Sequence, residues 1–165
     1  MRFATCANGT PDGELILLSR DGARGLPLGA RWPNLLHAIT DWNALLDDAA
    51  SLSATLEAGG GDSVDQATLL APLPRTWQWL DGSAFANHGA LMQRAFNHPP
   101  IETDLPLMYQ GMSHCFLAPQ EDVAFPTEAD FIDFEGEFAI VTDDVPMGCS
   151  AQDAMGHIRL ILLIN

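Results

Sequence analysis

Three carboxylates alternate along one stretch of the chain, in a pattern that can bind a divalent cation. Asp133, Glu135 and Glu137 lie within Phe131 to Val141, which we expect to form a β-strand. Alternate side chains of a strand point to the same face, with their Cα atoms roughly 6.5–7 Å apart. Carboxylates at this spacing can converge on Mg²⁺ or Mn²⁺, because both ions prefer oxygen ligands.

The same pattern also fits a strand whose acidic face is simply solvated. The residues of the opposite face are all apolar or glycine: Ile132, Phe134, Gly136, Phe138 and Ile140. Such an amphipathic strand is common in antiparallel sheets that have one wet face. Spacing alone therefore leaves a hard-cation site and a solvated acidic face both open. Zinc fits less well, because no histidine lies nearby in the sequence.

A second candidate lies upstream, where Gly82 falls between Asp81 and His88. We expect a loop to lead into a helix over His88 to Phe96, and a histidine at such a junction can serve as a general base near neutral pH. His88 can equally be a surface residue that caps this helix. A Ser83–His88–Asp81 triad can also be drawn, but it lacks the Gly-x-Ser-x-Gly elbow of serine hydrolases.

Tyr109 is the third candidate and the only tyrosine of the chain. It follows Leu105-Pro106-Leu107-Met108 and precedes Gln110-Gly111. Its hydroxyl can form a hydrogen bond with a ligand, or the ring can pack with the hydroxyl in water. The sequence at this position does not decide between the two.

The elements before these candidates indicate a small N-terminal domain. Strands are expected over Arg2 to Ala7, Glu14 to Ser19 and Ala23 to Leu28, separated by turn dipeptides. Helical periodicity then runs from Pro33 to Glu57, with Asp41 as the cap of a second helix. The glycine-rich segment that follows ends the helix, and we place a domain boundary near residue 70.

The second part is rich in short strands and loops. After the helix over His88 to Phe96, the clearest strand is Phe131 to Val141. Ser150 resembles the start of a capping box for a short helix, and Ile158 to Ile164 is expected to form a buried strand.

Composition excludes several classes of function. The 165 residues carry 22 acidic and 7 basic side chains, a net charge of −15, and every basic residue is arginine. Without lysine there is no Schiff-base or phosphate-loop lysine, and the scattered arginines argue against nucleic-acid and anionic-membrane partners. The apolar run Leu160 to Ile164 is far shorter than the ~20 residues of a membrane span. Three cysteines without Cys-x-x-Cys spacing predict free thiols in the cytoplasm.

Taken together, these segments resemble the fumarylacetoacetate hydrolase family of metal-dependent enzymes. The resemblance rests on Leu70-Ala71-Pro72-Leu73-Pro74, Phe85-Ala86-Asn87-His88, Phe116-Leu117-Ala118-Pro119, Ile132-Asp133-Phe134-Glu135-Gly136-Glu137 and the closing strand Ile158 to Asn165. It implies an α+β fold, with a small N-terminal α/β domain over residues 1–70. Residues 71–165 would form an incomplete catalytic domain, the first part of a mixed β-sandwich roll.

The resemblance also implies a role for each candidate. Glu135 and Glu137 match the two strand glutamates that bind the divalent cation, Mg²⁺ or Mn²⁺ with Ca²⁺ as an alternative. Asp81 matches a further carboxylate ligand of some members, His88 the catalytic base, and Tyr109 a substrate-contacting tyrosine. By the same comparison Asp133, the remaining carboxylate of the alternating run, is structural.

The implied activity, expected of the full-length protein and not of these 165 residues alone, is hydrolysis of a carbon–carbon bond in a diketone or acylpyruvate-type acid, within catabolism. Hydratases and decarboxylases of the same family remain alternatives, as does a non-catalytic acidic interaction module. In the family a further aspartate ligand follows the strand that ends here at Asn165, so we expect the chain to be truncated. We also expect a keto acid substrate and a homodimer.

Overall fold

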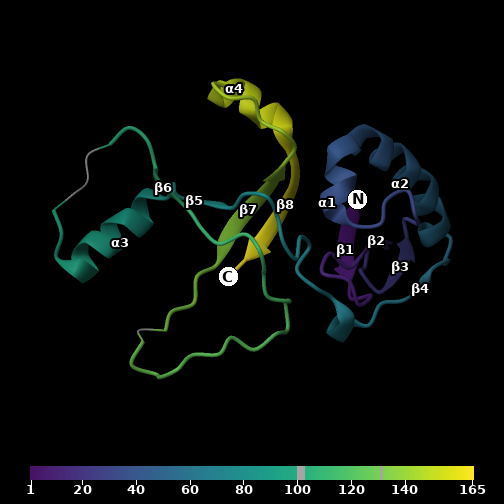
Figure 1. Cartoon of the computed structure of the whole chain (residues 1–165), viewed down its shortest axis with the longest axis horizontal. Coiled ribbons are helices and arrows are strands. Elements are labelled where there is room, and N and C mark those ends of the chain that lie inside the picture. Colours follow the sequence, from purple (N-terminus) through teal and green to yellow (C-terminus); the bar gives the residue numbers. More distant parts are fainter. Residues whose placement is uncertain (100–102, 131) are drawn as a thin grey trace. The chain divides into compact units, whose positions relative to one another are not determined.

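The structure, a computed structural model, describes residues 1–99, 103–130 and 132–165. The chain forms two compact units: the first comprises Met1–Pro74 and Phe116–Asn165, and the second comprises Arg75–Cys115. Both units contain helices and strands, which confirms the α+β class (Figure 1). None of the helices in the described ranges combines the length and the apolar character needed to cross a bilayer.

The N-terminal part of the first unit contains a four-stranded antiparallel sheet in the order β1-β2-β3-β4. Its strands are β1 (Arg2–Cys6), β2 (Glu14–Leu18), β3 (Arg24–Pro27) and β4 (Asp62–Ser63). The first three confirm the strands predicted from the sequence. Gly13 closes the first turn with a φ of +62°, and a Cβ there would come within 2.6 Å of the Cys6 carbonyl oxygen. This turn therefore requires glycine.

Two helices cover this sheet, α1 (Leu35–Ala38) and α2 (Trp42–Glu57), joined by the 3₁₀ turn Ile39–Asp41 (Figure 1). The Asp41 carboxylate accepts a hydrogen bond from the Ala44 amide, which confirms Asp41 as the N-cap of α2. Leucines from both layers meet in the core and are fully buried: Leu15, Leu17, Leu35, Leu45 and Leu56. Burying each such side chain contributes about 1.5–3 kcal/mol.

An antiparallel hairpin completes the first unit. It consists of β7 (Glu137–Thr142) and β8 (Ile158–Ile164), with the short helix α4 (Ala151–Ala154) in the connection. The Ser150 hydroxyl accepts from the Asp153 amide, which confirms the predicted cap of α4. Val141 is buried, and it packs with Leu160 and Leu162 against the core of the sheet and helices.

The prediction of one strand over Phe131 to Val141 is wrong for its first half. Residues 132–136 form no strand, and Phe131 lies outside the described residues. The pairing with β8 stops at Glu137 and Ile164, and no other described segment forms a ladder with residues 132–136. A strand needs a partner for its backbone groups, so the periodicity alone does not produce one here.

The structure shows which side of β7 turns toward the core, a point that the alternation of residues leaves open. Four apolar side chains of the hairpin point away from the core and are 71%, 54%, 70% and 78% exposed: Phe138, Ile140, Ile161 and Leu163. We call this set the apolar hairpin face. Because strand side chains alternate, Glu137 lies on the same side as the buried Val141. At Glu137, the acidic side of the predicted strand is therefore the side that turns toward the core.

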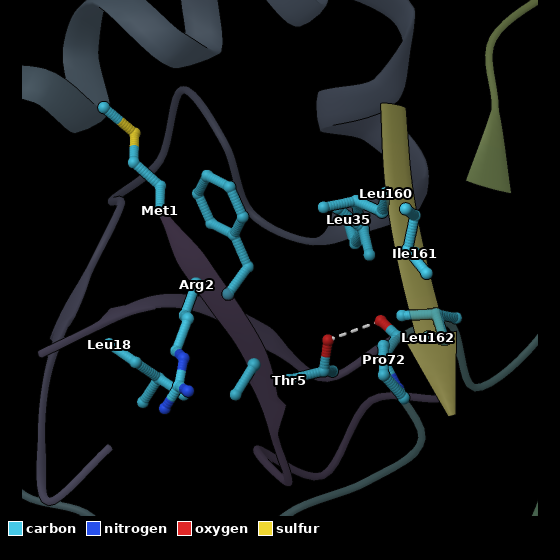
Figure 2. A pocket seen from close by; sticks show the side chains of 11 residues that line it. Met1, Arg2, Thr5, Leu18, Leu35, Pro72, Leu160, Ile161 and Leu162 are labelled. Atoms are coloured by element: carbon cyan, nitrogen blue, oxygen red, sulfur yellow. Dashed lines mark hydrogen bonds between the residues drawn. The ribbon is translucent and has the colours of Figure 1, made fainter. Parts of the chain in front are cut away.

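A groove of about 210 Å³ lies between β1 and β8 within the first unit (Figure 2). Its walls include Phe3, Leu35 and Leu162, and the Thr5 hydroxyl donates to the Pro72 carbonyl oxygen at 2.7 Å beside it. Ligand pockets usually enclose roughly 300–1,000 Å³, so this groove is small for a substrate site. None of the five candidate site residues lines it.

The second unit contains β5 (Leu80–Ser83), α3 (Ala86–Phe96) and β6 (Leu107–Gln110), and its two strands pair antiparallel. The helix begins two residues before the predicted start at His88 and ends where Asn97 adopts a left-handed φ of 52°. None of the described residues in this unit is buried. Its geometry therefore depends on backbone pairing and local contacts rather than on a core.

Candidate active site

Asp81 and Tyr109 face each other across the two strands of the second unit. They are direct register partners in the β5–β6 ladder. The Tyr109 hydroxyl donates a hydrogen bond to Asp81 Oδ2 at 2.7 Å, and the Trp79 ring packs edge-on against the tyrosine ring at 5.9 Å. Directly opposed residues have Cβ atoms about 4.5–5.5 Å apart, so the ladder itself brings the two side chains together.

His88 lies in the first turn of α3, which follows β5 after a two-residue connection. Its side chain is exposed. Within the described residues no hydrogen bond joins it to Ser83 or Asp81, and the Asp81 carboxylate is instead bound to Tyr109. The structure thus gives the Ser83–His88–Asp81 triad no support, and it leaves the imidazole of His88 accessible.

Glu135 and Glu137 lie in the first unit, at the entrance to β7. Glu137 is the first residue of the strand, pairs with Ile164 and is half-buried. Glu135 is exposed, and its amide donates to the Asn165 side-chain oxygen at 2.9 Å. Asp133 accepts from the Phe134 amide, in keeping with a structural role. The closing strand therefore anchors the backbone that carries both glutamates.

The donor chemistry of these residues fits a hard divalent cation. Glu135, Glu137 and Asp81 offer only carboxylate oxygens, the ligands that Mg²⁺ and Mn²⁺ prefer. Among the described residues, however, no three His, Cys, Asp or Glu side chains are grouped so that they would hold a metal ion. The structure brings Asp81 to Tyr109 in the second unit, and Glu135 and Glu137 lie in the first unit.

Two family models together span almost the whole chain. The model described as fumarylacetoacetase N-terminal domain 2 matches residues 1–75. The model described as fumarylacetoacetate hydrolase C-terminal matches residues 78–165, which contain all five candidate residues. The chain belongs to the fumarylacetoacetate hydrolase family. No curated protein matches it.

Membership in the fumarylacetoacetate hydrolase family confirms the resemblance inferred from the sequence. The family comprises enzymes of the hydrolase, isomerase and decarboxylase type, and it is generally dependent on divalent metal ions. The two matched ranges meet between residues 75 and 78.

Sequence reasoning missed a charged cluster in the β7–β8 hairpin, at the end where the connecting segment leaves β7 and enters β8. Asp143 Oδ1 lies 2.6 Å from His157 Nδ1, and Arg159 Nε donates to Asp143 Oδ2 at 2.9 Å. Burial alone would raise the pKa of Asp143, but the hydrogen bonds from Arg159 and His157 outweigh it and hold the pKa below its ordinary value of 3.8. The sequence held one indication of this cluster: His157 and Arg159 are the only basic side chains after His114, in a segment rich in acidic residues.

Replacing Asp143 with asparagine is expected to lower the free energy of unfolding by about 1–3 kcal/mol at pH 7, because hydrogen bonds between charged partners are lost. Since the pKa of Asp143 is lower in the folded chain, this stabilisation is complete above pH 3.8 and disappears as the pH falls further. Urea unfolding at neutral and acidic pH measures both effects. Asp144→Asn, at an exposed neighbour, is the control. If the difference in the free energy of unfolding between Asp143→Asn and the unaltered chain becomes larger in acid, the assignment of a lowered pKa to Asp143 is wrong.

Proposed function

We propose that the protein is a divalent-metal-dependent hydrolase that cleaves a carbon–carbon bond in a diketone or acylpyruvate-type acid. The observation that carries this proposal is the match of the fumarylacetoacetate hydrolase C-terminal model to residues 78–165. His88, Asp81, Glu135, Glu137 and Tyr109 all lie in that range. Carboxylates for a cation and a histidine for proton transfer are the groups that this chemistry needs.

In this function Glu135 and Glu137 hold the cation, Mg²⁺ or Mn²⁺ with Ca²⁺ as an alternative, and Asp81 is a further ligand. The bound cation supplies a Lewis acid that polarises a substrate carbonyl. His88 removes a proton from a water molecule, whose oxygen attacks that carbonyl carbon. The adjacent carbon–carbon bond then breaks, its electron pair stays on the departing carbon as an enolate, and a proton converts this fragment to the ketone.

Two observations support these roles. The imidazole of His88 is exposed and can reach a water molecule. Glu135 is exposed as well, and its backbone is tied to Asn165, so the carboxylate is accessible on an anchored segment. The exposure of Glu135 equally favours the alternative of a non-catalytic acidic module, which the metal experiment below separates from an enzyme. Product analysis separates the hydrolase from a hydratase or decarboxylase of the family.

The metal assignment predicts a specific thermal shift. Adding Mn²⁺ or Mg²⁺ at about 100 times its dissociation constant should stabilise the folded chain by about 2.7 kcal/mol, because the ion binds only the folded state. The variant Glu135→Gln/Glu137→Gln should lose this stabilisation, since it keeps the shape of both side chains and removes both charges. Thermal unfolding at matched ionic strength measures the shift for each ion.

The control is Glu57→Gln/Glu128→Gln, which removes the same charge from two exposed positions outside the site. It should retain the full shift of the unaltered chain. A shift that survives Glu135→Gln/Glu137→Gln would show that the ion binds elsewhere. If the unaltered chain responds to Mn²⁺ no more than to added NaCl, the acidic-module alternative is favoured.

The remaining parts of the proposal concern partners and location. The substrate is a small keto acid, the functional protein is a homodimer, and nucleic acids and membranes are not partners. Cys6, Cys115 and Cys149 are free thiols. Free thiols persist in reducing compartments, which supports a cytoplasmic location.

A further inference from the structure

We propose that Asn8 is a site of spontaneous deamidation, in which the backbone nitrogen of Gly9 attacks the side-chain amide of Asn8. The reaction converts this asparagine to aspartate or isoaspartate and adds one negative charge to the connection between β1 and β2. Asn8-Gly9 is the only asparagine–glycine pair of the chain. The inference is independent of the proposed function, because it concerns a connection of the first unit that carries none of the five candidate site residues.

The reaction needs no partner other than water. The Gly9 nitrogen loses its proton to hydroxide and forms a bond to the carbonyl carbon of the Asn8 side chain. The bond from this carbon to the amide nitrogen then breaks, and the nitrogen takes a proton from water and leaves as ammonia. Water opens the resulting five-membered imide at one of its two carbonyls, which gives aspartate or isoaspartate. In total one water molecule is consumed and one ammonia is released.

The Gly9 nitrogen is accessible for this attack. Asn8 and Gly9 are both exposed, and none of the hydrogen bonds among the described residues involves the Gly9 amide. A Cβ placed on Gly9 would meet no atom within 4 Å, so the space around this backbone is open. The nitrogen can therefore approach the neighbouring side chain without breaking a hydrogen bond or displacing a packed group.

Two donors of Thr10 bind the oxygen that becomes charged when the ring closes. The Thr10 amide donates to Asn8 Oδ1 at 3.0 Å, and the Thr10 hydroxyl donates to the same oxygen at 2.7 Å. This arrangement is an Asx turn, in which the side chain folds back toward the following backbone. Donors that are already in place at an oxygen stabilise the negative charge that develops there in a transition state. Thr10 therefore promotes the attack of the Gly9 nitrogen.

The three aspartate–glycine pairs of the chain can react by the same route but lack this combination. In Asp12-Gly13 the glycine is buried, and its amide donates to the Thr10 carbonyl oxygen at 3.3 Å. In Asp21-Gly22 the glycine amide donates to the Ser19 carbonyl oxygen at 2.9 Å. Asp81-Gly82 lies within the β5–β6 ladder. A carboxylate is also a weaker electrophile than a neutral amide. The structure therefore selects Asn8-Gly9 among the four pairs.

Peptide mapping by mass spectrometry on the incubated full chain tests the site. Cleavage after arginine places Asn8 on residues 3–20, which contain no other asparagine. At mildly alkaline pH this peptide should gain the mass that results when NH₂ is replaced by OH, and part of it should contain isoaspartate. The rate should rise with the hydroxide concentration. Asn97, an exposed asparagine followed by histidine, is the control within the same chain and should react several times more slowly.

The variant Thr10→Val tests whether the turn contributes beyond the dipeptide itself. It removes the hydroxyl donor and keeps the backbone donor, so the folded variant should react about 2–10-fold more slowly, the rate equivalent of one net hydrogen bond. In concentrated urea the turn is lost, and the variant and the unaltered chain should react at the same rate. Thr10→Ser keeps the hydroxyl and should react as fast as the unaltered chain.

Defined results overturn each part of the inference. The site is wrong if Asn8 keeps its amide as long as Asn97 does, or if isoaspartate forms equally fast at Asp12, Asp21 or Asp81. The role of the Thr10 donors is wrong if the folded Thr10→Val variant reacts as fast as the unaltered chain or faster.

Discussion

Replacing His88 with alanine is expected to lower kcat for hydrolysis of an acylpyruvate by about 10²–10⁴-fold, the usual contribution of a general base. KM should change far less, because the proposed role of His88 is proton transfer and the carboxylate-held cation binds the substrate. Initial rates at saturating Mn²⁺ measure both constants. Added imidazole should restore part of the rate, since it can enter the space left by an exposed side chain.

The matched control for this prediction is His98→Ala. His98 is another exposed histidine of the second unit, and its ring lies near Phe96 at the end of α3. This variant should keep the activity of the unaltered chain. Turnover by His88→Ala at the unaltered rate would remove His88 from the base role. An equal loss in both variants would point to general damage of α3 rather than to catalysis.

The largest loss of stability is expected from Leu45→Ala in α2. Leu45 is fully buried in the core between the sheet and the helices. Its truncation removes apolar contacts and leaves a cavity, which typically costs about 2–5 kcal/mol. Natural domains are stable by roughly 5–15 kcal/mol, so the variant should lose a large share of its free energy of unfolding. Urea unfolding followed by circular dichroism measures the change.

Leu163→Ala provides the comparison within the same unit. Leu163 is 78% exposed on the apolar hairpin face, so its truncation leaves no cavity. The expected loss is below about 1 kcal/mol, the span of strand propensities. Equal losses at the two positions would contradict the placement of the core.

The local elements could be predicted where the residue itself determines the geometry. Asp41 was recognised as a cap because its carboxylate can accept from the first turn of α2. The end of α3 followed from the polar and proline residues beyond Phe96, and Asn97 there adopts the left-handed conformation that asparagine tolerates. The candidate site residues were chosen by type and by resemblance, and their roles stay predictions; all five lie in the segment that the C-terminal family model matches.

Features that depend on distant partners could not be predicted in the same way. The strand proposed over residues 132–136 does not form, because β8 offers no pairing beyond Ile164. The contact of Tyr109 with Asp81 depends on the β5–β6 register, and 28 residues separate the two positions in the chain. The cluster of Asp143, His157 and Arg159 likewise forms only when the ends of a hairpin meet. Periodicity carries no information on any of these pairings.

The apolar hairpin face has a consequence for the behaviour of the protein in solution. Phe138, Ile140, Ile161 and Leu163 form an uncharged surface on a chain whose net charge is −15. Coulombic repulsion between molecules keeps such surfaces apart, and salt shortens its range to about 10 Å at 0.1 M. Repulsion vanishes near the isoelectric point of about 4.3. Because of this face, we expect the protein to associate more readily at high ionic strength or in acid. The mean hydropathy of +0.07 does not indicate this, because it averages over the whole chain.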